Sequence, residues 1–408
     1  MSQTSVSTDL SPRMTFAAAR LAATLWTPAF VRLLLAGSAY GFAFSSFHLM
    51  PKYLAVEFGA TPSQIGWSAG VFGIASVLTS VVVGVWIDRV SRRRLFAASA
   101  FLLAATSVAF ATVDAMGPLV LVLRALQGVA FTMQMASFST LVAELAPPAR
   151  LGEAVGLAGS SMLVMNAVAP AIDEPLARLA GWPAAYLLAA LAALASAVLV
   201  LETGAKGTAL PGGSGSLLAV LRREATISYC AITFLTALAF ATMFTFLQPA
   251  ALEAGYRDVG SFFVAYATAA CAVRLVFGWL PDRYGRRRVA IWALVPYVLV
   301  VAYVGMAGPT SLVAIGAVFG FAHGVFFPAL NALAIESTLV SERGRVLTLF
   351  AGTFNLGAWG GAAALGPVAE GPGYPAVFAI GALAAVGALL LLATTKAFRP
   401  AAPLEPPE

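Results

Sequence analysis

The chain is a series of long apolar runs separated by short polar or charged stretches. Residues 33–50, 95–113, 184–201 and 376–395 are clear examples, and each contains few charged residues. A helix needs roughly 20 residues to cross about 30 Å of hydrocarbon. Only helices and closed barrels satisfy their backbone in lipid, and these runs lack the alternation of barrel strands. We therefore predict an all-α membrane protein.

The runs, read against charges and Gly/Pro breaks, predict twelve transmembrane spans. Their ranges are 31–51, 65–87, 94–113, 118–140, 153–173, 183–201, 227–251, 260–281, 288–307, 310–333, 346–367 and 374–396. Residues 202–226 contain the sequence GGSGS, which is typical of a flexible linker. The expected organisation is a tail at 1–30, a six-helix half at 31–201, the linker at 202–226, a second half at 227–396 and a tail at 397–408.

Charge placement predicts the orientation of these spans. Only 10% of the 408 residues are charged, against about 25% in a soluble domain. The 24 basic residues exceed the 18 acidic ones. Of the basic residues, 19 fall on one predicted side, whereas Lys52, Arg178 and Arg257 fall on the other. This bias predicts cytoplasmic termini in the plasma (inner) membrane, and it argues against a nucleic-acid partner.

The two halves of the chain resemble each other in sequence. The stretch GVWIDRVSRRR at 84–94 matches GWLPDRYGRRR at 278–288, 194 residues further along. QGV at 127–129 likewise matches HGV at 323–325. A parallel repeat of six spans is typical of one group of secondary transporters.

The repeated loop resembles the signature loop of the major facilitator superfamily. The second copy keeps the Gly-x-x-x-Asp-Arg-x-Gly-Arg-Arg pattern, whereas the first departs from it at Trp86 and Ser91. The sequences that precede and include the two loops are similar to those of the arabinose-efflux-permease-like and drug-efflux groups. The resemblance implies two pseudo-symmetric six-helix halves that rock around a midplane cavity formed by spans one, four, seven and ten. The gating residues that it implies are Gly84, Asp88, Arg89, Arg92, Gly278, Asp282, Arg283 and Arg286.

The signature loops also have a physical reading. Gly84 and Gly278 would let a neighbouring helix approach closely. The resemblance implies that Asp88 lies against the start of span eleven, near Val346, and ties the halves together. The alternative is that Asp88 and the arginines only set the topology.

Two arginines fall inside predicted spans, where a charge is expensive and normally faces a cavity or a partner. Arg124 and Gln127 lie in RALQG, which resembles a family motif linked to proton coupling. A simple hydrogen-bonded strut is the alternative. Arg274 resembles an arginine of carboxylate carriers, where a bidentate fork holds the substrate, although efflux members also have it.

Other polar side chains at membrane depth complete the candidate substrate and coupling residues. His48 and His323 would titrate near neutral pH but lack a metal-binding partner pattern, so we expect no metal. They are more simply read as pore-lining or packing residues. The remaining candidates are Tyr40, Gln248, Asn331 and Asn355.

Two adjacent acids, Asp173 and Glu174, interrupt the apolar stretch NAVAPAIDEPL at 166–176. A helix that starts near Glu153 reaches the outer interface after about twenty residues, and Pro175 is expected to end it. We therefore predict a solvated outer mouth, with a proton or cation site as the alternative. Antiporters of the family often have Gly-Pro-x-x-Gly-Gly here, so the acids weaken an antiporter assignment.

The leading functional hypothesis is a secondary transporter of a small organic molecule, with proton-coupled efflux as its mode. An organic-anion carrier that uses Arg274 is the first alternative. A non-transporting membrane sensor or lipid-handling protein is the second. No nucleophile–base arrangement and no phosphate-binding loop is present, so we expect neither enzymatic activity nor a cofactor. The expected partners are a small substrate, protons and the bilayer, and the expected state is a monomer.

Overall fold

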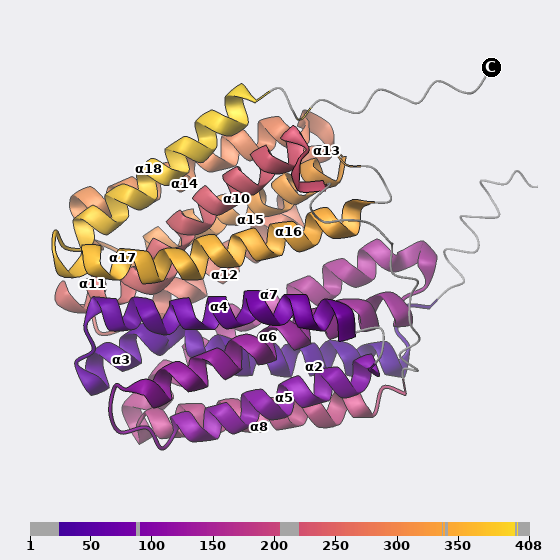
Figure 1. Ribbon diagram of the computed structural model, residues 1–408, viewed down its shortest axis with the longest axis horizontal. Coiled ribbons are helices and arrows are strands. Elements are labelled where there is room, and N and C mark those ends of the chain that lie inside the picture. Colours follow the sequence, from indigo (N-terminus) through magenta and orange to yellow (C-terminus); the bar gives the residue numbers. More distant parts are fainter. Residues whose placement is uncertain are drawn as a thin grey trace, which may run out of the picture.

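The computed structural model describes residues 24–86, 90–204, 220–336, 338, 342–395 and 398. These residues form two helical bundles and contain no strand (Figure 1). The first bundle contains α2 (Pro28–Ser45), η1 (Ser46–Leu49), α3 (Met50–Phe58), α4 (Pro62–Trp86), α5 (Arg92–Phe110), α6 (Pro118–Leu145), η2 (Pro148–Arg150), α7 (Leu151–Ala180) and α8 (Trp182–Leu201). The second contains α10 (Glu224–Ala241), η3 (Thr242–Phe246), α11 (Leu247–Glu253), α12 (Gly260–Phe277), α13 (Leu280–Tyr284), α14 (Arg286–Ala307), α15 (Leu312–Glu336), α16 (Arg343–Asn355), η5 (Leu356–Gly360), α17 (Gly361–Glu370) and α18 (Tyr374–Thr394).

The predicted fold class is confirmed. Among the described residues, ten helical segments are long and apolar enough to cross a membrane. α4 and the continuous α16–η5–α17 column run beside them (Figure 1). Several helices extend beyond the predicted spans, as Pro28–Phe58 does for 31–51. Most of the predicted tails and linker lies outside the described residues.

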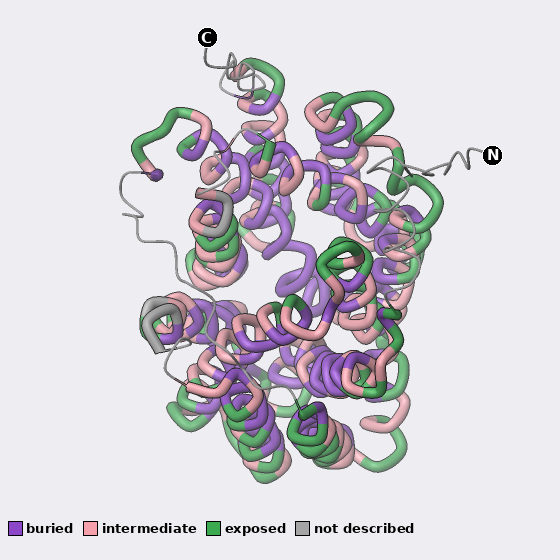
Figure 2. Tube along the Cα trace, turned by 90° about the vertical axis from the view of Figure 1, so that its right-hand side faces the viewer, coloured by how far each residue is buried: buried purple, intermediate pink, exposed green. Residues whose placement is uncertain are grey.

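Burial follows the expectation for helices in lipid. In the end-on view of Figure 2, buried positions lie where helices face one another, and exposed positions surround the assembly. Large apolar side chains cover that surface, among them Leu78, Leu191 and Met306, which are 65%, 63% and 89% exposed. Such an apolar exterior suits a lipid environment.

The six loops at 59–61, 111–117, 181, 254–259, 308–311 and 371–373 lie at one end of the bundles. We call this the outer end, following the charge prediction. Gly59, Gly181 and Gly373 adopt φ values of +58°, +81° and +92°, which side chains other than glycine rarely allow. These glycines let the chain reverse within one to three residues and keep neighbouring helices adjacent.

Small residues bring the two bundles into contact. Gly66, Gly70 and Gly73 lie on one face of α4, and a Cβ at each would collide with Ala362, Ala363 or Trp359. Helices that present glycine can approach to backbone contact, which compensates in lipid for the absence of a hydrophobic driving force. α4 and the α17 column therefore form a close contact between the bundles.

The first and seventh spans are interrupted at matching positions. η1 is a 3-10 turn that begins at Ser46, and η3 is a π-helical turn that begins at Thr242, 196 residues later. η5 adds a second π-helical turn at Leu356–Gly360. Irregular turns inside helices are frequent at functional sites. All three provide side chains or neighbours of the cavity described below.

The prediction that Pro175 ends the fifth span is wrong. α7 continues through Pro170 and Pro175 to Ala180. An interior proline removes one backbone hydrogen bond, and neighbouring helices in a membrane protein can compensate for that loss. As a result, Asp173 and Glu174 lie inside the helix rather than at its exposed end.

Candidate functional site

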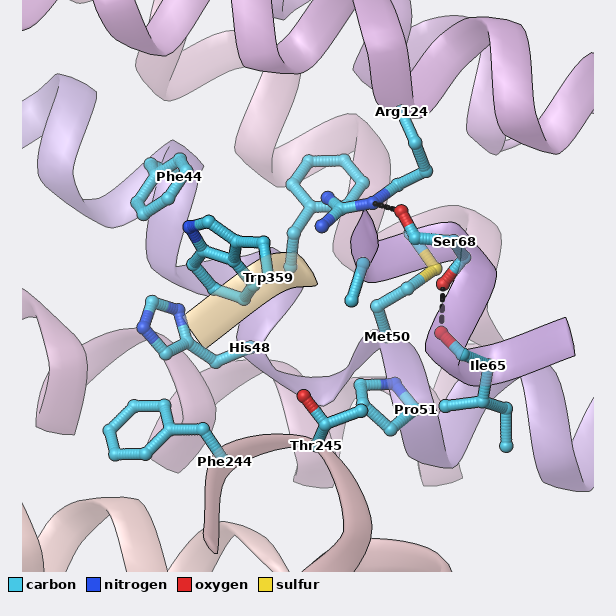
Figure 3. A pocket seen from close by; sticks show the side chains of 12 residues that line it. Phe44, His48, Met50, Pro51, Ile65, Ser68, Arg124, Phe244, Thr245 and Trp359 are labelled. Atoms are coloured by element: carbon cyan, nitrogen blue, oxygen red, sulfur yellow. Dashed lines mark hydrogen bonds between the residues drawn. The ribbon is translucent and has the colours of Figure 1, made fainter. Parts of the chain in front are cut away.

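A small cavity of about 40 Å³ lies between the bundles, in the outer half of the protein. Residues of both bundles line it (Figure 3): Phe44, Phe47, His48, Met50, Pro51, Ile65, Ser68, Ala69, Arg124, Phe244, Thr245 and Trp359. The interrupted segments η1 and η3 contribute His48, Phe244 and Thr245. Spans one, two, four, seven and eleven thus meet at one site.

Arg124 is the charged group of this cavity. It is only 6% exposed, yet no carboxylate among the described residues forms an ion pair with it. Its Nε donates to the carbonyl of Ser68 at 3.3 Å, and Nη1 donates to Oε1 of Gln127 at 2.7 Å. Nη2 has no hydrogen bond in the described part of the chain. The buried guanidinium is thereby held in place, and it still has N–H donors that are not used in these two hydrogen bonds.

The predicted pair of Arg124 and Gln127 therefore exists, although its hydrogen bond alone does not separate a strut from a substrate site. Phe72 packs against the guanidinium, whose carbon lies 4.8 Å from the ring centroid. A cation against an aromatic face gains electrostatic attraction from the ring. The phenyl ring cannot neutralise the charge, so the cavity keeps a positive potential.

Aromatic rings form much of the cavity wall. Phe44, Phe47, Phe244 and Trp359 line the cavity. Behind this wall, Phe72 meets Trp359 edge to face at 5.1 Å between centroids, across the boundary of the two bundles. Phe44 stacks on Phe131 at 4.7 Å. Rings in such arrangements accept another planar aromatic group in the same geometries. The wall therefore combines a flat apolar surface with one cation.

His48 also belongs to this site. Its Nδ1 lies 3.1 Å from the carbonyl of Ser45, and its ring is edge-on to Phe44, Phe244 and Phe263. It is close enough to Arg124 for an electrostatic interaction. Its position in η1 places a polar ring between the two bundles.

Two predicted amides bridge the bundles. Gln248 donates to the carbonyl of His48 at 2.8 Å and to that of Phe244 at 2.9 Å. Asn355 lies 3.4 Å from the hydroxyl of Ser76, which allows a weak hydrogen bond from α16 to α4. A movement of the bundles relative to each other would therefore break or lengthen hydrogen bonds of these side chains.

Other predicted residues lie away from the cavity. Tyr40 is fully buried in the first bundle, edge-on to Phe96. His323 pairs with the hydroxyl of Tyr266 at 2.7 Å, and Arg274 donates to the carbonyl of Gly324 at 3.3 Å. Asn331 accepts from the hydroxyl of Tyr229 at 3.1 Å. The last three hydrogen bonds all lie within the C-terminal bundle.

The acids Asp173 and Glu174 are not a solvated mouth. They are 1% and 2% exposed, which contradicts the predicted location. Glu174 forms an ion pair with Lys52, whose ammonium also donates to the carbonyl of Arg257. The error arose because the helix was expected to end at Pro175, whereas its continuation places both acids between packed helices.

Glu174 connects the two bundles. Its carboxylate accepts from the backbone N–H of Val259 at 3.0 Å and of Gly260 at 2.6 Å. Val259 is the N-cap of α12 and Gly260 is its first residue, where the N–H groups lack intrahelical partners and the helix dipole is positive. Glu174 of α7 thus caps a helix of the other bundle. We call Glu174, Lys52 and the backbone of residues 257–260 the outer latch.

The predicted gating residues are only partly visible. Asp88 and Arg89 lie outside the described residues, and Gly84 falls in the last turn of α4. Arg92 is buried at the start of α5. All predicted gating residues of the second copy are described. Gly278 follows α12, and Asp282 lies 3.9 Å from Arg286. The guanidinium of Arg283 lies 5.5 Å from the ring centroid of Trp279. Arg286 also donates to the carbonyl of Ala332 at 3.0 Å.

Sequence reasoning missed three important residues. Trp359 belongs to the aromatic wall, Phe72 packs against both Trp359 and Arg124, and Lys52 completes the outer latch. Aromatic residues are common in apolar spans, so nothing in the pattern singled out these two. Lys52 had a usable signal, because it is one of only three basic residues on the predicted outer side.

No group of three or more His, Cys, Asp or Glu side chains that could hold a metal occurs among the residues that the structure describes. Cys230 and Cys271 are not disulfide-bonded.

The fold and the cavity between its bundles define a multi-pass membrane protein of the transporter class. The sequence profile described as "Major Facilitator Superfamily" matches residues 32–257 and 229–408. The chain belongs to the major facilitator superfamily and is a membrane transporter, not an enzyme.

Relatives support this assignment. The chain is 26% identical over 320 residues to "Putative niacin/nicotinamide transporter NiaP" of Bacillus subtilis (strain 168), which covers 75% of this chain and 72% of that protein. The structure of the nucleoside transporter NupG superposes with a TM-score of 0.73 at 15% identity, covering 90% of this chain and 99% of that one. The structure of the peptide transporter POT gives 0.74 at 16% identity, covering 89% and 93%. These two likenesses establish the shared fold.

Proposed function

We propose that this transporter carries small aromatic carboxylates, with Arg124 as the group that binds the carboxylate. The observation that carries the proposal is the buried guanidinium at a cavity without a carboxylate partner. A buried charge without a counter-charge is costly, and a substrate anion would supply that counter-charge. Nη2 is the free donor for a charge-assisted hydrogen bond.

The aromatic wall supports a planar substrate. A ring bound beside Arg124 would lie among the rings that line the cavity, such as Phe44 of the first bundle and Trp359 of the second. The present cavity, at about 40 Å³, has room for only a few water molecules. Substrate entry therefore requires the bundles to separate, as alternating access around this site would provide.

The relative named for niacin and nicotinamide points to the same chemistry. Niacin is a pyridine ring with a carboxylate, and its amide has the same ring without the charge. The proposal keeps the organic-anion alternative but moves the carboxylate ligand from Arg274 to Arg124. Arg274 donates instead to backbone within its own bundle.

Proton-coupled efflux through the plasma membrane, with both termini in the cytoplasm, remains a prediction. The apolar aromatic wall would also suit export of lipophilic compounds. The alternative of a non-transporting sensor or lipid handler is not retained, because the chain belongs to a transporter family.

Transport in proteoliposomes tests the proposal. The substrates are nicotinate, benzoate, acetate, nicotinamide and a lipophilic cation, each with and without an imposed pH gradient. We expect nicotinate and benzoate to move and to compete with each other, and acetate to compete weakly. Movement of the lipophilic cation without competition by aromatic carboxylates would overturn the proposal in favour of drug efflux.

A further inference from the structure

Two neighbouring acids of α7 have opposite surroundings. Glu174 has a lysine and two backbone N–H groups as partners. Asp173 is 1% exposed, and neither of its carboxylate oxygens has a hydrogen-bond partner in the described structure. The nearby hydroxyl of Ser46 donates to the carbonyl of Phe42 at 3.1 Å. A charged carboxylate without a partner is strongly disfavoured in such a place, and a bound proton removes its charge.

The groups around Asp173 do not neutralise it. From α8, Tyr186 interacts with it electrostatically, and the phenol oxygen of that tyrosine is also buried without a hydrogen bond. Tyr186 also interacts electrostatically with Tyr53 and Glu57 of α3 and with Arg124 of α6. Further charged or titratable groups at this end of the packed elements include His48 of η1, Lys52 of α3, Glu174 and Arg178 of α7, and Arg257 and Asp258 just before α12.

None of these cations forms an ion pair with Asp173 in the described part of the chain. Lys52 is paired with Glu174, and Arg124 donates to Gln127 and Ser68. His48 has its Nδ1 against the carbonyl of Ser45. Asp173 therefore has no ion pair among the residues that the structure describes.

The cover over Asp173 depends on contacts between the bundles. Ser46 belongs to η1, the interrupted turn that packs on α7. η1 is held by the C-terminal bundle, because Gln248 donates to the carbonyl of His48 and Phe244 and Phe263 enclose the His48 ring. When the outer end opens, η1 loses this support, and water can reach Asp173.

We propose that Asp173 is a proton-binding site, occupied while the outer end is closed and emptied into the outer solution when it opens. Closing the outer end then takes up one proton from the outer solution, which adds to one carboxylate oxygen of Asp173. Glu174 stays charged in the outer latch. The proposal rests on the proposed alternating-access transport, in which it makes the opening of the outer end depend on the outer pH, but not on the identity of the substrate.

The sign of the pH effect follows from linkage. The closed state binds the extra proton, so a lower outer pH favours closure. A solvated aspartate titrates near pH 4, so above that pH the open state holds no proton at this position. The closed-to-open ratio then falls by up to about tenfold per pH unit, until the closed state also loses its proton.

The test measures the opening of the outer end without any substrate. Spin labels at Val56→Cys and Ala254→Cys, two exposed uncharged positions of the opposing bundles, report their separation in nanodiscs. The background replaces Cys230 and Cys271. We expect the short distance to lose population as pH rises. Asp173→Asn should keep the short distance at every pH, because its amide is neutral and nearly the same size.

Glu174→Gln is the matched control at the neighbouring position. It should shift the population toward the long distance while keeping the pH dependence. The proposal is overturned if Asp173→Asn retains the wild-type pH dependence, or if Glu174→Gln abolishes it. It is also overturned if the wild-type population does not change with pH.

Infrared spectroscopy gives a second readout of the same site. A protonated-carboxyl band should be present in wild type under closed conditions and absent in Asp173→Asn. Loss of substrate transport with an intact pH-dependent gate would instead count against the proposed substrate class alone.

Discussion

Replacement of Glu174 by glutamine tests how strongly the outer latch holds the bundles together. The carboxylate accepts N–H bonds from Val259 and Gly260, and such bonds to a charged group contribute about 1.5–3 kcal/mol, against 0.5–1.5 for neutral partners. Glutamine keeps one acceptor oxygen and presents an NH₂ group to the other donor. Lys52 lies in the same bundle as Glu174. Their ion pair therefore contributes about equally to the open and closed states and changes the closed-to-open ratio little.

We therefore expect Glu174→Gln to weaken closure by about 2–3 kcal/mol, which lowers the closed-to-open ratio roughly 30- to 150-fold. The assay is labelling of Ala69→Cys by a membrane-impermeant thiol reagent added outside, in a background without Cys230 and Cys271. Ala69 lines the cavity and is 6% exposed, so the reagent reaches it only when the outer end opens. We expect faster labelling in the Glu174→Gln variant.

Arg178→Gln is the control for this experiment. Arg178 lies 3.6 Å from Asp258 across the same boundary, but the two side chains are 52% and 65% exposed. Exposed pairs of this kind contribute little, so labelling should change by less than about fivefold. Equal labelling in wild type and Glu174→Gln, or equal acceleration in both variants, would refute the assignment of the latch to Glu174.

Two further substitutions probe the contact between bundles and the aromatic wall. Gly66→Ala places a methyl group against the backbone of Ala362, so the outer end should close less completely, and outside labelling of Ala69→Cys should be faster than in Gly152→Ala, where open space surrounds the added methyl. Trp359→Ala should weaken binding of benzoate about 2- to 13-fold beyond the loss of contact area but change acetate binding little, as measured by calorimetry. An equal loss for both ligands would remove Trp359 from the substrate site.

Much of the fold was predictable because its rules are local. Span length, the charge asymmetry and the repeated loop each follow from a few residues. The pairing of Arg124 with Gln127 was also readable, since the two positions are one turn apart on a helix. The cavity was harder, because Phe72 and Trp359 approach from different bundles and neither position has a distinctive sequence environment.

The acids show most clearly what the sequence could not reveal. A proline and two charges suggested the end of a helix, whereas α7 continues to Ala180. The burial of Glu174 depends on Lys52 and on the first turn of α12, which are 122 and about 85 residues away in the chain. A charge that is costly in isolation becomes acceptable when tertiary partners satisfy it, and those partners are set by the packing of the two bundles.

Arg124 is the residue proposed to bind the carboxylate of an aromatic substrate. Binding of nicotinate and nicotinamide to purified wild type, Arg124→Lys and Arg124→Gln tests this role. Removal of the buried charge should not destabilise the ligand-free protein, so the variants should fold. We predict that Arg124→Gln weakens nicotinate binding roughly 10- to 150-fold and barely affects nicotinamide, with Arg124→Lys between wild type and Arg124→Gln. Unchanged nicotinate affinity in Arg124→Gln, or an equal loss for both ligands, would contradict the account.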